Sequence, residues 1–129
     1  MLYQVKSSRP LDEIERGLEE FAAPHRFGVI AIHDLRDTIK KKGVDLNMEC
    51  RIYEVCNPQQ AKKVLETDGA ISTVLPCRIS VFGSKGSYTL ATMRPTEMMK
   101  AFDRPEIEPV AMEVEEVILQ MMRDAAGRQ

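Results

Sequence analysis

Apolar positions run together or alternate in some segments of the chain and recur at helical spacing in others. Apolar runs and alternation predict strands at residues 2–6, 27–33, 47–55, 77–82 and 87–93. The second pattern predicts helices between Pro10 and Pro24, from Asp34 to Lys42, after Asn57, after Pro95, and over about 110–124. We expect the strand at 27–33 to be buried on both faces, 103–109 to form an exposed loop, and 125–129 to fray.

These elements predict the fold class. Short strands and helices alternate, and no repeat or long linker interrupts them. The order indicates an α+β fold, a two-layer sandwich in which a sheet of about five strands is mixed or mostly antiparallel. The helices should cover mainly one face of the sheet.

Local turn chemistry is clearest after the third strand. Asn57 can cap a helix, Pro58 suits its first position, and Gln60 stands where a capping box places its second member. The segment Gly83–Gly86 joins two strand patterns and predicts a hairpin turn.

Length, charge and cysteine number limit the kinds of protein that fit. The chain has 129 residues, a net charge of −2 and both signs interspersed, so residues 1–129 suit one domain and nucleic acid is not an expected partner. No apolar run is long enough for a membrane span, and the first residues show no secretory signal. Three cysteines are an odd number, which favours free thiols and a cytoplasmic location.

Cys56 and Cys77 are the first candidates for chemistry. Cys56 directly precedes a predicted helix, where unpaired amides tend to lower a thiol pKa. If the strands that contain them are neighbours, the two thiols form a redox pair or half of a soft-metal site. The competing interpretation is that both are small buried core residues. Cys50 lies too far along its strand to join them.

A second set of candidates is polar. Arg51 and Arg78, with the helix start at Asn57, would bind a small anion if their strands pair. The alternative is that both are surface arginines paired with Glu49 or Glu54. His33 ends a strand, where it is either a ligand or base, or a structural residue.

Methionines mark a possible contact surface. Met98, Met99, Met121 and Met122 lie on two helical segments near the C-terminus. Methionine is enriched both in subunit interfaces and in adaptable cores, so the pattern fits either place.

Three blocks of sequence resemble the bacterial and archaeal family called domain of unknown function 302. They are Ile32-His33-Asp34-Leu35 with Lys42-Gly43, then Arg51-Ile52-Tyr53-Glu54-Val55-Cys56-Asn57-Pro58, then Leu75-Pro76-Cys77-Arg78-Ile79-Ser80-Val81. The resemblance implies a compact two-layer fold that is often a homodimer, and it implies no reaction. On this view the chain adds a strand and helix before the blocks and an amphipathic helix after them.

Three functions remain open from the sequence. The first is a binding module for a small anion or soft metal at Cys56 and Cys77, with His33, Arg51, Asn57 and Arg78 nearby. The second is a thiol redox enzyme or sensor that uses the two cysteines. The third is a structural protein that acts as a homodimer. The sequence indicates no particular cofactor, and it leaves open whether the protein is an enzyme.

Overall fold

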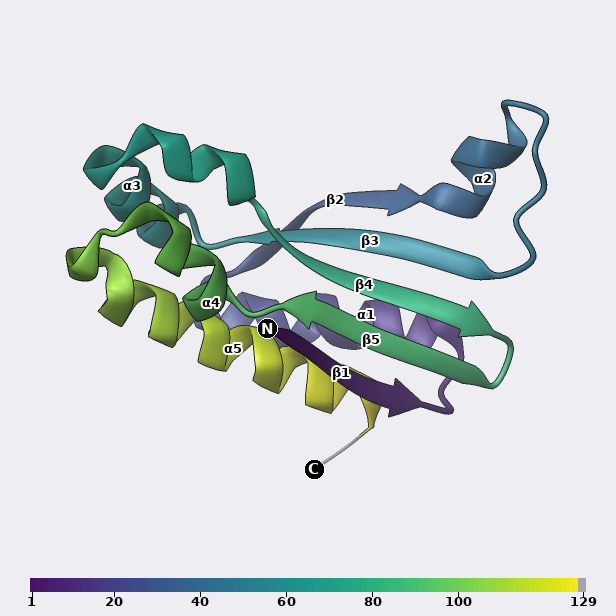
Figure 1. Cartoon of the computed structure of the whole chain (residues 1–129). Coiled ribbons are helices and arrows are strands. Elements are labelled where there is room, and N and C mark those ends of the chain that lie inside the picture. Colours follow the sequence, from purple (N-terminus) through teal and green to yellow (C-terminus); the bar gives the residue numbers. More distant parts are fainter. Residues whose placement is uncertain (128–129) are drawn as a thin grey trace.

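The computed structural model describes residues 1–127 and contains one sheet with its helices (Figure 1). The strands are β1 (Leu2–Ser7), β2 (Gly28–Asp34), β3 (Glu49–Cys56), β4 (Cys77–Ser84) and β5 (Ser87–Met93). The α-helices are α1 (Leu11–Ala22), α2 (Leu35–Lys40), α3 (Pro58–Thr67), α4 (Pro95–Met99) and α5 (Glu108–Ala126). Short 3₁₀ helices are η1 (Ala23–His25), η2 (Gly69–Val74), η3 (Lys100–Phe102) and η4 (Pro105–Ile107).

The sheet has the strand order β1-β5-β4-β3-β2, and every neighbouring pair is antiparallel. β4 and β5 form the predicted hairpin, with Ser84 opposite Ser87 across the turn. The last strand of the hairpin then pairs with the first strand of the chain. The expected α+β sandwich with about five strands is therefore confirmed, and its sheet is wholly antiparallel.

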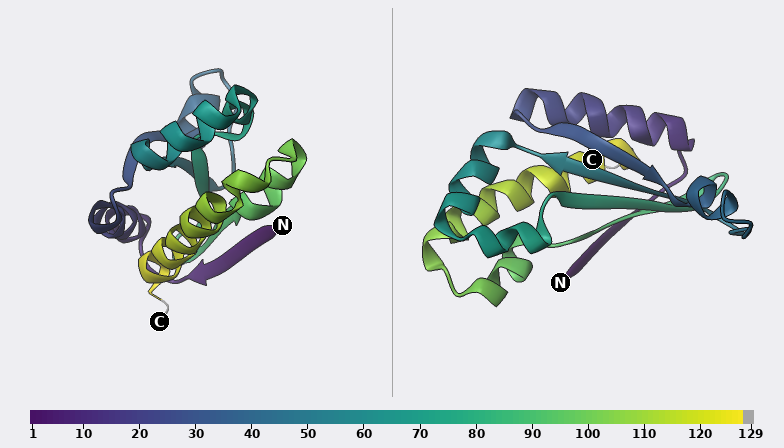
Figure 2. Two further views of the ribbon diagram at one scale, coloured as in Figure 1. Left: turned by 90° about the vertical axis from the view of Figure 1, so that its left-hand side faces the viewer. Right: turned by 90° about the horizontal axis from the view of Figure 1, so that it is seen from above.

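Helices α1 and α5 cover one face of this sheet (Figure 2). The predicted stripe on α1 is buried at Leu11, Ile14 and Leu18. The two helices approach closely at Gly17, where an added Cβ would lie 3.0 Å from the Cα of Ala125. A side chain at position 17 would therefore force the helices apart, since close-packed interiors leave no spare volume.

The covered face and the two helices form the main core. Along β3 and β4 the inward residues alternate with outward ones, as a half-covered sheet requires. The fully buried large side chains of this core include Tyr53, Ile79, Leu90, Ile118 and Met121.

A second, smaller apolar cluster lies at one end of the sheet. There α3, η2 and α4 gather beside the first half of α5 (Figure 1). Its buried members are Val64, Ile71, Met99, Ile107 and Ala111. This cluster belongs to the helices rather than to the sheet, and the two clusters meet at Leu75.

Three sequence expectations were wrong in detail. β2 is an edge strand, so Ile30 and Ile32 are 58% and 44% exposed instead of buried. Ile107, within the expected loop, is buried in the second cluster. Ala125 and Ala126 are buried against α1 and β1 within α5 rather than frayed, while residues 128–129 lie outside the described part.

Of the two places that the methionine pattern fits, the structure shows the core for Met99, Met121 and Met122. Met121 and Met122 have no exposed surface, and Met99 belongs to the second apolar cluster. These side chains fill the core, so they offer a partner nothing to contact. Within residues 1–127, no helix combines the length and the hydropathy needed to cross a membrane.

Candidate functional site

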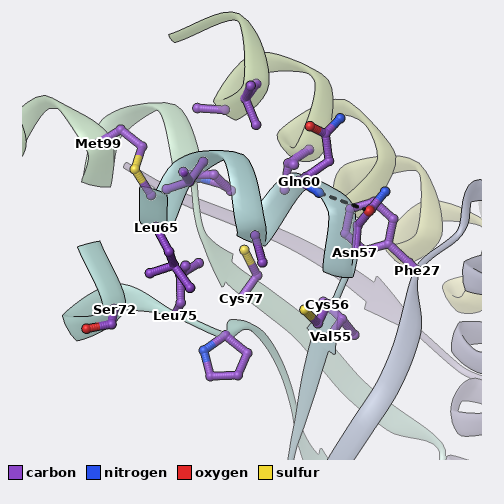
Figure 3. Close-up of a pocket in the computed structure, with 17 residues that line it drawn as sticks. Phe27, Val55, Cys56, Asn57, Gln60, Leu65, Ser72, Leu75, Cys77 and Met99 are labelled. Carbon is purple, nitrogen blue, oxygen red and sulfur yellow. Dashed lines mark hydrogen bonds between the residues drawn. The ribbon is translucent and has the colours of Figure 1, made fainter. Parts of the chain in front are cut away.

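A pocket of about 310 Å³ opens where the ends of β3 and β4 meet the second apolar cluster (Figure 3). This volume is at the lower end of the range usual for ligand sites. The wall consists of Phe27, Val55, Cys56, Asn57, Gln60, Ala61, Val64, Leu65, Ser72, Leu75, Pro76, Cys77, Pro95, Met99, Val110, Ala111 and Val114. None of these residues carries a charged side chain.

The pocket brings the two candidate thiols together. β3 and β4 are neighbours, and Val55 stands opposite Cys77, so Cys56 is one residue away from that pair. Both side chains contribute to the wall and lie side by side beneath α3 (Figure 3). The expected convergence of the two strands is correct. Cys50 is opposite Phe82, toward the other end of β3, and does not line the pocket.

Both thiols are held in their neutral form. Burial raises the pKa of Cys77 to about 11, and the neighbouring Cys56 adds to the shift. Burial also raises the pKa of Cys56. The expected acidification of Cys56 by the helix start was therefore wrong, because desolvation of the thiolate outweighs the amide dipoles. A redox enzyme needs a thiolate, so this direction works against the redox hypothesis.

The start of α3 is already capped by its own residue. The Oδ1 of Asn57 accepts hydrogen bonds from the backbone N–H groups of Gln59 and Gln60, at 3.1 and 3.2 Å. The predicted N-cap is correct, but the capping box is not. The Gln60 side chain donates instead to Glu113 on α5, at 3.1 Å. The two amides that an anion would use at this corner are thus occupied.

The two arginines of the expected anion site lie on opposite faces of the sheet. Arg51 is on the covered face, where its Nη1 is 3.2 Å from the carboxylate of Glu15. Arg78 is on the uncovered face, 3.5 Å from Glu54. Arg78 therefore pairs with Glu54, as the alternative predicted, whereas Arg51 is largely buried and pairs with Glu15 rather than with Glu49 or Glu54. Neither guanidinium lines the pocket.

His33 belongs to the uncovered face as well. Its Nε2 lies 2.9 Å from Oε1 of Glu54, whose side chain is only 14% exposed. The histidine and the Arg78 guanidinium lower the pKa of Glu54 by hydrogen bonding and charge, with His33 the larger cause. Because this group sits away from the pocket wall, His33 does not join the two thiols.

Of the six candidate residues, the pocket unites Cys56, Asn57 and Cys77 and leaves out the other three. Sequence reasoning missed the remaining wall, which α3, α4 and α5 supply through residues such as Leu65, Met99 and Ala111. Their helical spacing indicates only that they are apolar and turned inward. Nothing in that pattern says that the space between them stays open.

The described residues offer no ready metal centre. No group of three or more His, Cys, Asp or Glu side chains is close enough to hold an ion anywhere in residues 1–127. Cys56 and Cys77 alone would supply two ligands, and both would have to lose a proton first.

Comparison with known proteins places this arrangement in a family. The crystal structure of an uncharacterized conserved DUF302 protein from Bacillus stearothermophilus superposes with a TM-score of 0.88, at 27% sequence identity and over 97% of both chains. No curated protein matches the chain. The family model described as Domain of unknown function DUF302 matches residues 3–125, well beyond the motif blocks, so the chain belongs to this family.

Proposed function

We propose that the protein is a small-molecule binding module whose site is the pocket at Cys56 and Cys77. The observation that carries the proposal is an open hollow of about 310 Å³ bounded by apolar side chains from three helices and two strand ends. Apolar clefts with a few polar groups are the usual form of small-molecule sites. Apolar side chains that line an open hollow stay in contact with water, and a bound ligand would relieve this unfavourable exposure.

Residues on the wall divide into two groups that suit binding. Val55, Cys77 and Val64 are buried and form a rigid floor fixed by the sheet and α3. Leu65, by contrast, is 37% exposed and lies at the edge of the wall. A ligand would enter past exposed side chains and rest on residues that the core holds in place.

The test is a titration with three separate probes: the neutral fluorophore prodan, inorganic phosphate and Zn²⁺. The probes represent an apolar ligand, an anion and a soft metal. We expect at least one to bind to the wild-type chain and to lose its affinity in Ala61→Phe, since Ala61 lines the pocket on a half-buried turn of α3. Ala101→Phe, at an exposed position on η3 outside the wall, is the matched control and should bind as the wild type does.

If no probe shows binding that Ala61→Phe removes and Ala101→Phe retains, the pocket is not the site and the proposal fails. Each variant adds one phenyl ring to the chain. Circular dichroism of both variants shows whether either substitution has unfolded the protein. The comparison therefore separates a blocked pocket from a damaged fold.

We also propose that the chain is a homodimer through the uncovered face of the sheet. This face carries Ile52 on β3 and Phe82 on β4, and both side chains are half-buried. Apolar surface of this kind marks contact sites. Glu54 lies 2.9 Å from His33 and 3.5 Å from Arg78 on the same face, so the Arg78 guanidinium has an acidic partner within the chain and does not face a second copy unpaired.

Sedimentation velocity tests the dimer. The wild type should sediment at about twice the chain mass of 14.6 kDa, and Phe82→Asp should sediment as a monomer. A wild type that remains at 14.6 kDa at high concentration would refute the dimer, and an unchanged mass for Phe82→Asp would move the interface elsewhere.

A further inference from the structure

The chemistry of the pocket wall limits what the pocket accepts, and this step rests on the function proposed above. We infer that the ligand is an uncharged, largely hydrocarbon molecule of about two fused rings in size. A dry apolar cavity of about 150 Å³ holds benzene, and the pocket has about twice that volume. The inference departs from the anion and the soft metal expected from the sequence, and three features of the wall carry it.

The first feature is the absence of any counter-charge. No lysine, arginine or histidine is among the described residues on the wall, and the two arginines once expected there are engaged with Glu15 and Glu54. Transfer of an unpaired charge from water into such surroundings is strongly unfavourable. An anion would therefore lose its hydration and gain no charged partner.

The second feature is how the polar atoms of the wall are used. Asn57 Oδ1 already accepts two amides of α3, so these charge-favouring donors are occupied, and the Asn57 Nδ2 and Ser72 hydroxyl groups left on the wall are neutral. Gln60 Nε2 donates to Glu113, and this bond fixes the orientation of the amide group. Gln60 Oε1 is left buried with no hydrogen-bond partner, so the buried polar atom of the described wall that lacks a partner is an acceptor. An acceptor repels an anion and tolerates hydrocarbon or a weak donor.

The third feature is the state of the thiols. The sulfur of Cys77 is buried, and burial raises its pKa to about 11, so the group is neutral at physiological pH. Soft metals bind the thiolate, and two such ionisations side by side would repel each other. Neutral thiols instead behave as small apolar groups that contact hydrocarbon well.

Competition against prodan tests the class of ligand. The competitors are naphthalene, 1-naphthol and 1-naphthoate, which share one ring system and differ in a hydrogen, a hydroxyl or a carboxylate. We expect naphthalene and 1-naphthol to displace prodan, and 1-naphthoate to do so at least about tenfold less well. Ala61→Phe should lower displacement by the first two, and Ala101→Phe should leave it unchanged.

A variant that introduces a charge tests the ligand class through the ratio of two affinities, those for 1-naphthoate and 1-naphthol, rather than through one affinity. Leu65 lies on the wall and is 37% exposed, so Leu65→Arg adds a guanidinium at the edge of the pocket without burying it fully. We expect this variant to improve binding of 1-naphthoate relative to 1-naphthol by about threefold or more, because a carboxylate then has a partner. The matched variant Leu65→Gln should leave the ratio as in the wild type.

The outcomes separate this inference from the proposed function. If 1-naphthoate competes as well as naphthalene in the wild type, or if prodan binds and none of the naphthalenes displaces it, the ligand class is wrong and the pocket remains a binding site. If instead Zn²⁺ or phosphate binds in a manner that Ala61→Phe abolishes while prodan does not bind, the class is overturned in favour of an ion. If none of the three probes of the earlier titration binds, both claims fall.

Discussion

Cys77→Ala should remove a specific part of the pH dependence of stability. Cys77 is 8% exposed, and burial raises its pKa from 9.0 to about 11. The native state therefore prefers the neutral thiol, while the unfolded chain ionises near pH 9. The stability that this preference contributes is fully present below pH 9 and is lost as the pH rises from 9 to 11.

The size of the effect follows from these two pKa values. At pH 8 the unfolded thiol is mostly protonated, and the contribution of its ionisation to the free energy of unfolding is close to zero. At pH 10 the unfolded thiol is mostly ionised and the native thiol is not, which lowers the free energy of unfolding by about 1.3 kcal/mol relative to pH 8. Other groups titrate in the same range, so the quantity to compare is the difference between the wild type and Cys77→Ala.

Urea unfolding under reducing conditions, followed by far-ultraviolet circular dichroism at pH 8 and pH 10, measures this difference. Cys77→Ala leaves a small void whose cost is the same at both pH values, so only the ionisation changes between them. Cys56→Ala is the matched control, and it should show a smaller change because Cys56 is only partly buried. Equal losses of stability in the wild type and in Cys77→Ala would refute the claim that the pocket floor keeps this thiol neutral.

Three further changes test the parts of the fold that position the site. Asn57→Ala should destabilise the protein by about 1 kcal/mol in urea unfolding, because the first amides of α3 lose their acceptor. Tyr53→Phe removes the hydrogen bond to Glu15, 3.0 Å long, and should cost about 1.5 kcal/mol, measured in the same way; no loss would mean that water replaces the hydroxyl. Gly17→Val should cost about 2 kcal/mol by pushing α1 away from Ala125, and thermal unfolding that is unchanged would disprove the close contact.

The sequence predicted the sheet well because each strand has a local signature. β4 and β5 alternate cleanly on either side of a glycine-rich turn, and this pattern fixes both their pairing and their register. The order of the other strands depends on contacts between distant residues, such as β1 beside β5, and no local pattern contains it. The expected burial of both faces of β2 was wrong for this reason, since an apolar run looks the same in an edge strand that exposes Ile30.

The candidate site was predicted in part for similar reasons. Cys56 and Asn57 stand at a strand-to-helix corner that local chemistry identifies, and pairing of β3 with β4 adds Cys77. The two arginines were misplaced because residue parity decides the face of a sheet. Arg51 faces the helices and Arg78 faces away, although both lie on neighbouring strands. The register also separates them, because Arg51 stands opposite Val81 while Arg78 stands opposite Glu54.

The position of the pocket explains why a bound ligand should affect the stability of the helices around it. The sheet with α1 forms one apolar cluster, and α3, η2 and α4 form another, while α5, at 19 residues, runs through both. The pocket draws its wall from both clusters: Val55 and Cys77 from the first, Val64 and Met99 from the second. A molecule that fills the pocket contacts both apolar clusters, so its binding free energy stabilises the packing of α3, η2 and α4 against the sheet.

Helices that rest on a small cluster of their own open more readily than core strands do. Hydrogen exchange in α3 should therefore slow on binding of a pocket ligand, while exchange in β5, within the main core, should change little.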